Sequence, residues 1–509
     1  DAAGGGSITF VKGRLGADNN IFDFGGTKLS ASGSAQSVPD GHEPIFSSLT
    51  FVDSLQGASD SNAVTMNNGS TQNSSVTLTG GASAVFVSGA AGTSSNTITL
   101  NGTALSAEGA SKDGRVYGDI TLISSSEGSV SGSIVTMENR SSQASSVTLT
   151  GGASAVFVSG AAGASSNTIT LNGTTLSAEG VSEGGCVYGG ITLVRSSEGS
   201  VSGSMLTVNT ATLKATGGTA IDFVSSASGA VSNTITLNET NLSAEGVSED
   251  GNVYEGISLV SSADGSVSGS TLEINTATLQ ATDGASIHFI NGANGVEKYT
   301  IGLDGADISA AGAQAGGSVY GDITLVESSH GIVSGSGSKL TLSRDGSGNR
   351  TSLAATDGAS VYFVNGAEGA EGNTIELNGA DISAKGVQAD GRVYGGAITL
   401  IGSSDGTVSG STVNLHSDGS GAGTTLSATD GASIHLVSGA KGAEGNAIEI
   451  NGAAITADGD QADGVTYGSS SLIESLSGTA TDNKVYLHST GSSITSFQIQ
   501  DGADMTLVS

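Results

Sequence analysis

The sequence predicts an all-β protein, a parallel β-helix of about 13 to 15 coils with three strands in each coil. The first observation is repetition: RVYGDITLISSSEGSVSGS, which begins at Arg115, returns as CVYGGITLVRSSEGSVSGS at Cys186. The second is that short runs such as Ile-Thr-Leu alternate apolar and polar residues between Gly, Asn, Asp and Ser, which is typical of strands and turns. The third is that units this small cannot bury an apolar face alone, so successive units must stack.

The repeat has a double period. One tyrosine marks each long unit, and consecutive marks lie 66 to 74 residues apart: Tyr117, Tyr188, Tyr254, Tyr320, Tyr394 and Tyr467. Each long unit divides into two related halves of about 33 residues. Aligning two halves matches Ile191 with Ile221, Leu193 with Phe223, Val201 with Val231, Leu206 with Ile235 and Leu213 with Leu242.

Three segments follow from the repeat. We expect residues 1–45, which hold both prolines, to form an N-terminal cap and first coil, because an open end would expose unpaired strand edges. Residues 46–467 carry the repeated β-helix, and residues 468–509 are expected to form degenerate C-terminal coils. The start at Asp1 is that expected of a processed product, and the end within the pattern predicts that more sequence followed.

Columns of equivalent residues predict what faces inward and outward. The inward column alternates large and medium residues: Phe86, Leu122, Phe157, Leu193, Phe223, Leu259, Phe289, Leu325, Phe363, Leu400 and Leu436. Because strand side chains alternate, the preceding positions point outward: Val85, Val156, Asp222, His288, Tyr362 and His435. A third column is expected to be structural, with each amide bonded to its own turn: Asn96, Asn167, Asn233, Asn373 and Asn446, with Tyr299 as the exception.

Composition excludes several classes of function. The formal net charge of -32 disfavours binding to nucleic acid or to anionic lipid. No run of 18 apolar residues occurs that would span a bilayer as a helix. A single cysteine, Cys186, rules out an internal disulfide framework.

We find no constellation for catalysis in the sequence. Polysaccharide-cleaving sites need carboxylates clustered with Lys or Arg. The 16 Lys and Arg residues of this chain are scattered, and no unique residues interrupt the repeat where such a site would lie. His288 and His435 lie four coils apart, about 20 Å, too far to share a metal. The prediction is therefore a protein without enzymatic activity, cofactor or dedicated metal site. Weak calcium binding at Asp283, Asp357 and Asp430 stays open.

One corner of the coil varies in length. This corner is the short sequence NTAT at residues 209–212 and 275–278. It is longer in four other coils, where it starts at residue 67, starts at residue 138, or occupies residues 343–352 and 416–425. This pattern predicts a ridge of long loops with a saddle over about residues 200–290, and loops carry binding on repeat scaffolds. The candidate partner-binding residues are Asn139, Arg140, Arg344, Arg350 and His416. The alternative is that insertions are simply tolerated at this corner.

Units such as VYGG…SGSTVNL and GNTIELNGADISA resemble repeats of the passenger domains of Gram-negative autotransporters, over roughly residues 46 to 490. The resemblance implies a right-handed β-helix, secreted or held on the extracellular side of the outer membrane. It implies a natural C-terminal outer-membrane β-barrel, which is absent from this chain. It also implies a virulence-type adhesin that binds a host surface protein or glycan, or self-associates. The alternatives are a β-helix polysaccharide lyase or hydrolase and a structural fibre protein. No RGD tripeptide occurs.

Overall fold

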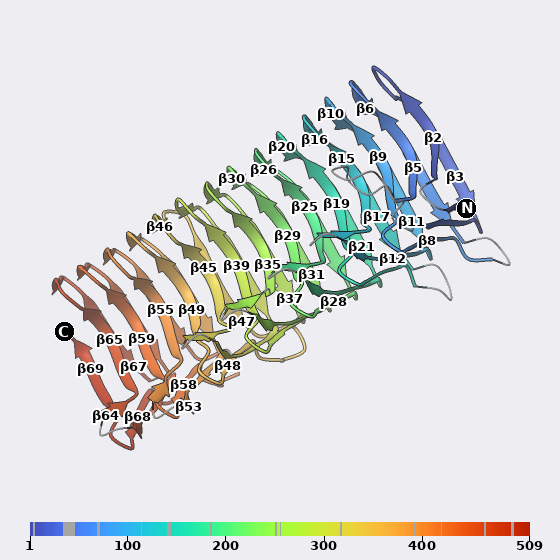
Figure 1. Ribbon diagram of the computed structural model, residues 1–509. Coiled ribbons are helices and arrows are strands. Elements are labelled where there is room, and N and C mark those ends of the chain that lie inside the picture. Colours follow the sequence, from blue (N-terminus) through green and yellow to red (C-terminus); the bar gives the residue numbers. More distant parts are fainter. Residues whose placement is uncertain are drawn as a thin grey trace. The chain divides into compact units, whose positions relative to one another are not determined.

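A computed structural model describes residues 1–509 except 4–5, 34–45, 69–71, 113–114, 140–143, 184–185, 250–251, 255, 316–317, 390–391, 419, 463–464 and 490–492. The described residues form strands and turns and no helix. Four parallel sheets hold 15, 13, 14 and 15 strands (Figure 1). The prediction of an all-β parallel β-helix is confirmed.

Apart from the coils at the two ends, each coil contributes one strand to each sheet, so such a coil has four strands where the sequence suggested three. The additional strand is a run of two or three residues that follows the long strand. A tight bend separates the two, as at Ser403, whose Oγ accepts a hydrogen bond from the N–H of Gly406 (2.9 Å). A Cβ on Gly406 would lie 1.8 Å from the carbonyl oxygen of Glu368 in the preceding coil, so only glycine fits this bend.

The sheets are numbered here in the order in which a coil meets them. The first sheet holds the long strands: β2 (Ser7–Gly13), β5 (Ser48–Ser54), β9 (Ser83–Gly89), β15 (Ile120–Ser125), β19 (Ser154–Gly160), β25 (Gly190–Ser196), β29 (Ala220–Ser226), β35 (Gly256–Ser262), β39 (Ser286–Gly292), β45 (Ile323–Ser328), β49 (Val361–Gly366), β55 (Ala397–Ser403), β59 (Ser433–Gly439), β65 (Ser469–Ser475) and β69 (Asp504–Val508). The second sheet holds the shortest strands: β6 (Ala58–Asp60), β10 (Gly92–Ser94), β16 (Ser129–Ser131), β20 (Gly163–Ser165), β26 (Ser200–Ser202), β30 (Gly229–Val231), β36 (Ser266–Ser268), β40 (Val296–Glu297), β46 (Ile332–Ser334), β50 (Gly369–Glu371), β56 (Thr407–Ser409), β60 (Gly442–Glu444) and β66 (Thr479–Thr481).

The third and fourth sheets hold mostly five-residue strands. The third contains β3 (Ile21–Gly25), β7 (Ala63–Asn67), β11 (Thr97–Asn101), β17 (Ile134–Glu138), β21 (Thr168–Asn172), β27 (Met205–Asn209), β31 (Thr234–Asn238), β37 (Thr271–Asn275), β41 (Thr300–Asp304), β47 (Lys339–Ser343), β51 (Thr374–Asn378), β57 (Thr412–His416), β61 (Ala447–Asn451) and β67 (Lys484–His488). The fourth contains β1 (Ala2–Ala3), β4 (Lys28–Ser32), β8 (Ser75–Thr79), β12 (Ala104–Glu108), β18 (Ser146–Thr150), β22 (Thr175–Glu179), β28 (Thr212–Thr216), β32 (Asn241–Glu245), β38 (Thr278–Thr282), β42 (Asp307–Ala311), β48 (Ser352–Thr356), β52 (Asp381–Lys385), β58 (Thr425–Thr429), β62 (Ala454–Asp458) and β68 (Ser496–Gln500).

The chain divides into two compact units. Unit 1 consists of residues 1–235 with 240–245 and 254–256, and unit 2 of residues 257–509 with 236–239 and 246–253. In unit 1, β25 pairs in register with β29, which places Ile191 beside Ile221. In unit 2, β55 pairs in the same way with β59, which places Thr399 beside His435.

The core follows the predicted Phe/Leu column. Every member from Phe86 to Leu436 is at most 1% exposed, and the outward positions before the phenylalanines are partly exposed. The predicted alignment of Val201 with Val231 was wrong by one residue. Val201 pairs with Ala230, and Val231 is 40% exposed. The turn before β30 is one residue shorter than the turn before β26, so Ala230 enters the core and Val231 turns outward.

The asparagine column is structural, as expected, but its partners differ from those predicted. Asn446 is fully buried; its amide donates to the carbonyl of Val408 (2.9 Å) and accepts from the N–H of Ser411 (3.0 Å), both in the preceding coil. In several of these turns the residue before the asparagine adopts the positive φ, as Ser95 does before Asn96. The amides therefore join successive coils and do not bond to their own turns.

In the described part of the chain, six antiparallel hairpins leave the corner between the fourth and first sheets, and the sequence did not lead us to expect them. Their strands are β13 (Ala110–Lys112) with β14 (Arg115–Tyr117), β23 (Val181–Glu183) with β24 (Cys186–Tyr188), β33 (Val247–Glu249) with β34 (Asn252–Tyr254), β43 (Ala313–Ala315) with β44 (Ser318–Tyr320), β53 (Val387–Ala389) with β54 (Arg392–Tyr394), and β63 (Asp460–Ala462) with β64 (Val465–Tyr467). Side chains from two consecutive hairpins pack against a glycine in the turn before a first-sheet strand. A Cβ on Gly431, for example, would lie 2.7 Å from Val393 and 3.1 Å from Tyr467.

Candidate functional site

Two of the long loops lie in unit 2, and both contain the sequence DGSG. In the loop after β47, the Asp345 carboxylate accepts hydrogen bonds from the N–H groups of Ser347 (2.9 Å) and Asn349 (2.7 Å). In the loop after β57, Asp418 accepts from the N–H groups of Ser420 (2.8 Å) and Ala422 (3.0 Å). Each aspartate thus fixes its own turn, which is the usual role of Asp at this position.

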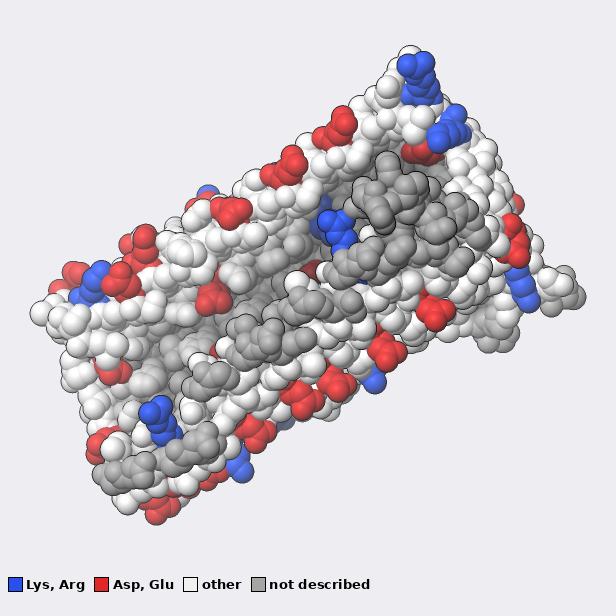
Figure 2. Space-filling model, in the orientation of Figure 1, with Lys and Arg blue, Asp and Glu red and all other residues white. Residues whose placement is uncertain are grey.

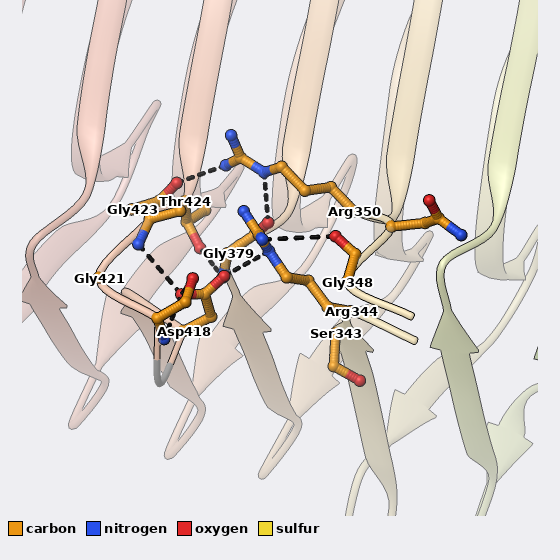
Figure 3. A network of polar contacts seen from close by, with 12 residues as sticks. Ser343, Arg344, Gly348, Arg350, Gly379, Asp418, Gly421, Gly423 and Thr424 are labelled. Atoms are coloured by element: carbon orange, nitrogen blue, oxygen red, sulfur yellow. Dashed lines mark hydrogen bonds and ion pairs between the residues drawn. The ribbon is translucent and has the colours of Figure 1, made fainter. Parts of the chain in front are cut away.

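Arg344 joins one loop to the other. Its guanidinium forms an ion pair with Asp418, and the two side chains are 24% and 10% exposed (Figure 3). Partial burial alone would raise the pKa of Asp418, but hydrogen bonds from Ser420 and Ala422, with the charge of Arg344, outweigh it and lower that pKa. A cavity of about 480 Å³ opens between the loops, lined by Arg344, Asp345, Asn378, Asp418 and Ser420 with neighbouring Ser and Gly residues.

Arg350 spans a greater distance. Its Nε donates to the carbonyl of Gly379 (2.7 Å), its Nη2 lies 2.8 Å from the Asp381 carboxylate, and the same nitrogen donates to the carbonyl of Gly423. Gly379 belongs to the short turn of the intervening coil and Gly423 to the next long loop (Figure 3). The guanidinium therefore braces three successive corners of unit 2.

The remaining predicted residues are placed as follows. In unit 1, the Asn139 amide closes its own loop by accepting from the N–H of Ser145 (2.9 Å) and donates to the carbonyl of Gly173. Arg140 lies outside the described residues. His416 Nε2 lies 3.7 Å from the Glu449 carboxylate. The structure brings Arg344 and Arg350 together, while Asn139 lies in unit 1 and His416 beside the next coil. The saddle predicted over 200–290 includes residues of both units and stays a prediction.

A second group of polar side chains, which the sequence analysis did not assemble, lies on the outer face of the first sheet in unit 2. His288 on β39 lies 3.9 Å from Glu327 on β45, and these side chains are 33% and 27% exposed. Tyr362 on β49 and Asp322, just before β45, belong to the same group. Burial raises the pKa of Glu327, and repulsion from Asp322 adds to this effect. A hydrogen bond from Asn365 lowers the pKa but does not offset the rise. The signal in the sequence was the outward column that holds His288 and Tyr362.

An equivalent contact, between a histidine and a glutamate on the adjacent strand, recurs two long repeat units further along the chain. His435 Nδ1 on β59 lies 3.0 Å from Glu474 and 2.8 Å from Ser471 Oγ on β65, and the Ser471 hydroxyl lies 3.0 Å from Glu474. A serine nucleophile requires its base on one imidazole nitrogen and the orienting carboxylate on the other. Here both contacts converge on Nδ1, so this Ser-His-Glu group does not have the geometry of a nucleophilic triad. His288 and His435 point outward as predicted, and each also lies beside a glutamate of the adjacent strand.

Burial raises the pKa of Asp322 to about 6, although a hydrogen bond from the N–H of Ser360 (2.7 Å) lowers it in part. Because the folded pKa is above the unfolded value, the protonated form favours folding, and this contribution is lost as the pH rises from about 4 through 6. We expect Asp322→Asn to raise the free energy of unfolding by about 1–3 kcal/mol at pH 7, and by nothing at pH 3.5. Urea unfolding followed by circular dichroism at the two pH values measures this.

The matched control is Asp119→Asn in unit 1. Asp119 accepts the equivalent hydrogen bond from Ser154 (3.1 Å), and burial also raises its pKa, but Arg195 offsets part of the effect. The gain at pH 7 should therefore be smaller. An equal or larger gain for Asp119→Asn would contradict this account of Asp322.

Comparison with models of known protein families and with curated proteins finds no match to this chain. Within the described ranges, no group of three or more His, Cys, Asp or Glu side chains is placed to hold a metal ion. The same residues include no helix with the length and hydropathy needed to cross a membrane.

Proposed function

We propose that this protein is a cell-surface adhesin that binds its partner through the long loops and acts without catalysis. The observation that carries the proposal is the pair of long loops in unit 2, which Arg344 and Arg350 hold together around a cavity of about 480 Å³. A surface fixed in this way before binding avoids much of the entropy cost of ordering loops on association. The resemblance to autotransporter passengers supports the same proposal, with a host surface protein or glycan, or another copy of the chain, as the partner.

The partner contacts would come mainly from groups that the internal network leaves available. Both guanidinium groups and both turn aspartates are engaged within the protein. What the loops present outward is therefore chiefly peptide groups, Ser and Gly. Such a surface suits hydrogen bonding to a polar partner more than attraction by net charge.

The test is to display the chain on bacteria and to shorten the loops. Replacing residues 343–352 and 416–425 by the short turn NTAT should leave the free energy of unfolding within about 1 kcal/mol, because loop length alone has a small cost. Adhesion to host cells, or clumping of the displaying bacteria, should fall at least tenfold. Comparing the two assays separates host binding from self-association.

Two controls sharpen this test. Arg344→Met keeps the loop length but removes the ion pair with Asp418, and it should weaken adhesion less than the shortened loops do. Shortening the unit 1 loop at 138–146 in the same way shows whether the long loops of unit 2 are enough for adhesion without it. A shortened unit 2 variant that folds and adheres at full strength would rule out the loops as the binding surface.

A polysaccharide lyase or hydrolase is the second candidate, and the group around Glu327 favours it. Asp322 and Glu327 share one strand face with Tyr362 and His288, and burial raises the pKa of both carboxyl groups. Carboxyl groups with raised pKa values are typical of general acids. Release of reducing ends or unsaturated sugars from a polysaccharide panel, abolished by Glu327→Gln, would establish this function in place of adhesion.

A further inference from the structure

Outside the loops, the outer face of the first sheet in unit 2 gathers several polar side chains, among them two His–Glu pairs. The strands β39, β45, β49, β55, β59 and β65 lie side by side (Figure 1), and the space-filling view in the same orientation shows the surface hollowed over them (Figure 2). Near the middle of each strand, two adjacent side chains both point inward, as Leu325 and Val326 do in β45. Because side chains of a straight strand alternate, this pattern indicates a bend at that point. The outward side chains before and after the bend therefore face a shared hollow.

Two His–Glu pairs at equivalent positions mark the two ends of this hollow, 3.9 Å apart in one and 3.0 Å apart in the other. His288 lies diagonally across from Glu327, and His435 lies diagonally across from Glu474, at the same pair of register positions. Four strand steps separate the two histidines, about 19 Å at ~4.8 Å per step. All four side chains are between 23% and 33% exposed, so each pair is partly shielded yet accessible from the hollow.

The floor between these ends combines one aromatic ring with small polar side chains. Tyr362 and Asn365 point outward from β49, and the next strand presents only Thr399 and Gly402 at the equivalent positions. Gly402 leaves its outward position without a side chain, and the Asn365 amide bonds to Glu327. The outward positions beside the tyrosine ring therefore carry only small side chains, with hydrogen-bonding groups next to them.

His288 Nδ1 is a shielded polar atom in the hollow. It has no hydrogen-bond partner among the described residues, because Glu327 is 3.9 Å away. Buried polar atoms are nearly always bonded. Because the atom is shielded from solvent, a movement of His288 toward Glu327 would satisfy it, and a ligand that fills the hollow would stabilise that closer arrangement.

We infer that this hollow binds a neutral oligosaccharide chain laid along it, from the His288–Glu327 pair to the His435–Glu474 pair. Sugar hydroxyls donate to carboxylates and accept from imidazole, amide and hydroxyl groups, which are the groups present. The apolar face of a sugar ring packs on an aromatic ring such as Tyr362. Anionic chains are disfavoured, since Asp322, Glu327 and Glu474 make the hollow acidic in a protein of net charge -32.

The test uses the full chain and six hexasaccharide probes: maltohexaose, cellohexaose, laminarihexaose, xylohexaose, chitohexaose and the anionic hexagalacturonate. Saturation-transfer NMR identifies binding and calorimetry gives the Kd. We expect at least one neutral probe to bind. Tyr362→Ala should weaken it at least tenfold, whereas Tyr362→Phe, which keeps the ring, should stay within threefold.

Tyr486→Ala is the control, because this tyrosine is 47% exposed on the third sheet, away from the hollow. The inference is overturned if no neutral probe binds at millimolar concentration, if only hexagalacturonate binds, or if Tyr362→Ala binds as tightly as the parent chain. Cleavage of a bound probe would uphold the hollow as the site and overturn the non-enzymatic function. Because this site is independent of the loops, adhesion of the Tyr362→Ala variant tests the two proposals separately.

Discussion

Phe363→Ala is expected to lower the free energy of unfolding by about 3–5 kcal/mol, the usual cost of deleting a buried aromatic ring. Phe363 is fully buried on β49, within the inward column of unit 2. Its neighbours along the column are medium-sized, Leu325 and Leu400, and they belong to hydrogen-bonded strands that cannot close around a cavity. Native-state hydrogen exchange measures the loss in β45, β49 and β55 directly, which matters because stability in a repeat protein is largely local.

Phe363→Leu is the control for this prediction. Leucine already occupies the same inward position in the adjacent coils, so its shape suits the column, and the smaller volume should cost about 1–2 kcal/mol. Tyr362→Ala removes a ring from the opposite face of the same strand and should have less effect than either. If Phe363→Ala and Phe363→Leu destabilise equally, packing in the column is not what holds these coils together.

The fold was predictable because its signals are periodic. The Phe/Leu column identified the inward face correctly from Phe86 to Leu436, since every coil repeats the same burial pattern. The error at Val231 arose where a turn lost one residue, because an alignment that conserves apolar character does not detect a shift that exchanges Ala for Val in the core. The fourth strand was missed because it has only two or three residues, which is shorter than the alternating runs that indicate a strand.

The hairpins had a signal that went unused. KDGR at residues 112–115 and ADGR at 389–392 place Asp-Gly between two short alternating runs, which is among the strongest indications of a two-residue β-hairpin. The candidate site was harder to predict. That Arg344 and Arg350 lie on a long loop is visible in the sequence, but their pairing with Asp418 and Asp381 depends on which corners stack. The His288–Glu327 contact likewise depends on register between coils, which the sequence shows only after the alignment is known.

Asn373→Ala should be the other strongly destabilising substitution, with a loss of about 3 kcal/mol. Asn373 is fully buried; its amide accepts from the Tyr299 hydroxyl (2.8 Å) and donates to the carbonyl of Val333 (3.1 Å). At Asn446 the amide oxygen accepts from the N–H of Ser411 in the preceding coil. Two extra residues after Gly335 displace the equivalent N–H from Asn373, and the Tyr299 hydroxyl, two coils away, donates in its place. Alanine would leave the Tyr299 hydroxyl and the Val333 carbonyl buried without partners.

A double-mutant cycle with Tyr299→Phe isolates this compensation. Tyr299→Phe alone should cost about 1–3 kcal/mol, because it leaves the Asn373 oxygen unsatisfied. The double variant should cost at least 1 kcal/mol less than the sum of the two single changes, since each removes the same hydrogen bond. Asn414→Ala, on the outer face of β57, is the control and should stay within about 0.5 kcal/mol of the parent chain. Strictly additive losses would mean that Tyr299 fills space at this position and does not replace the missing donor.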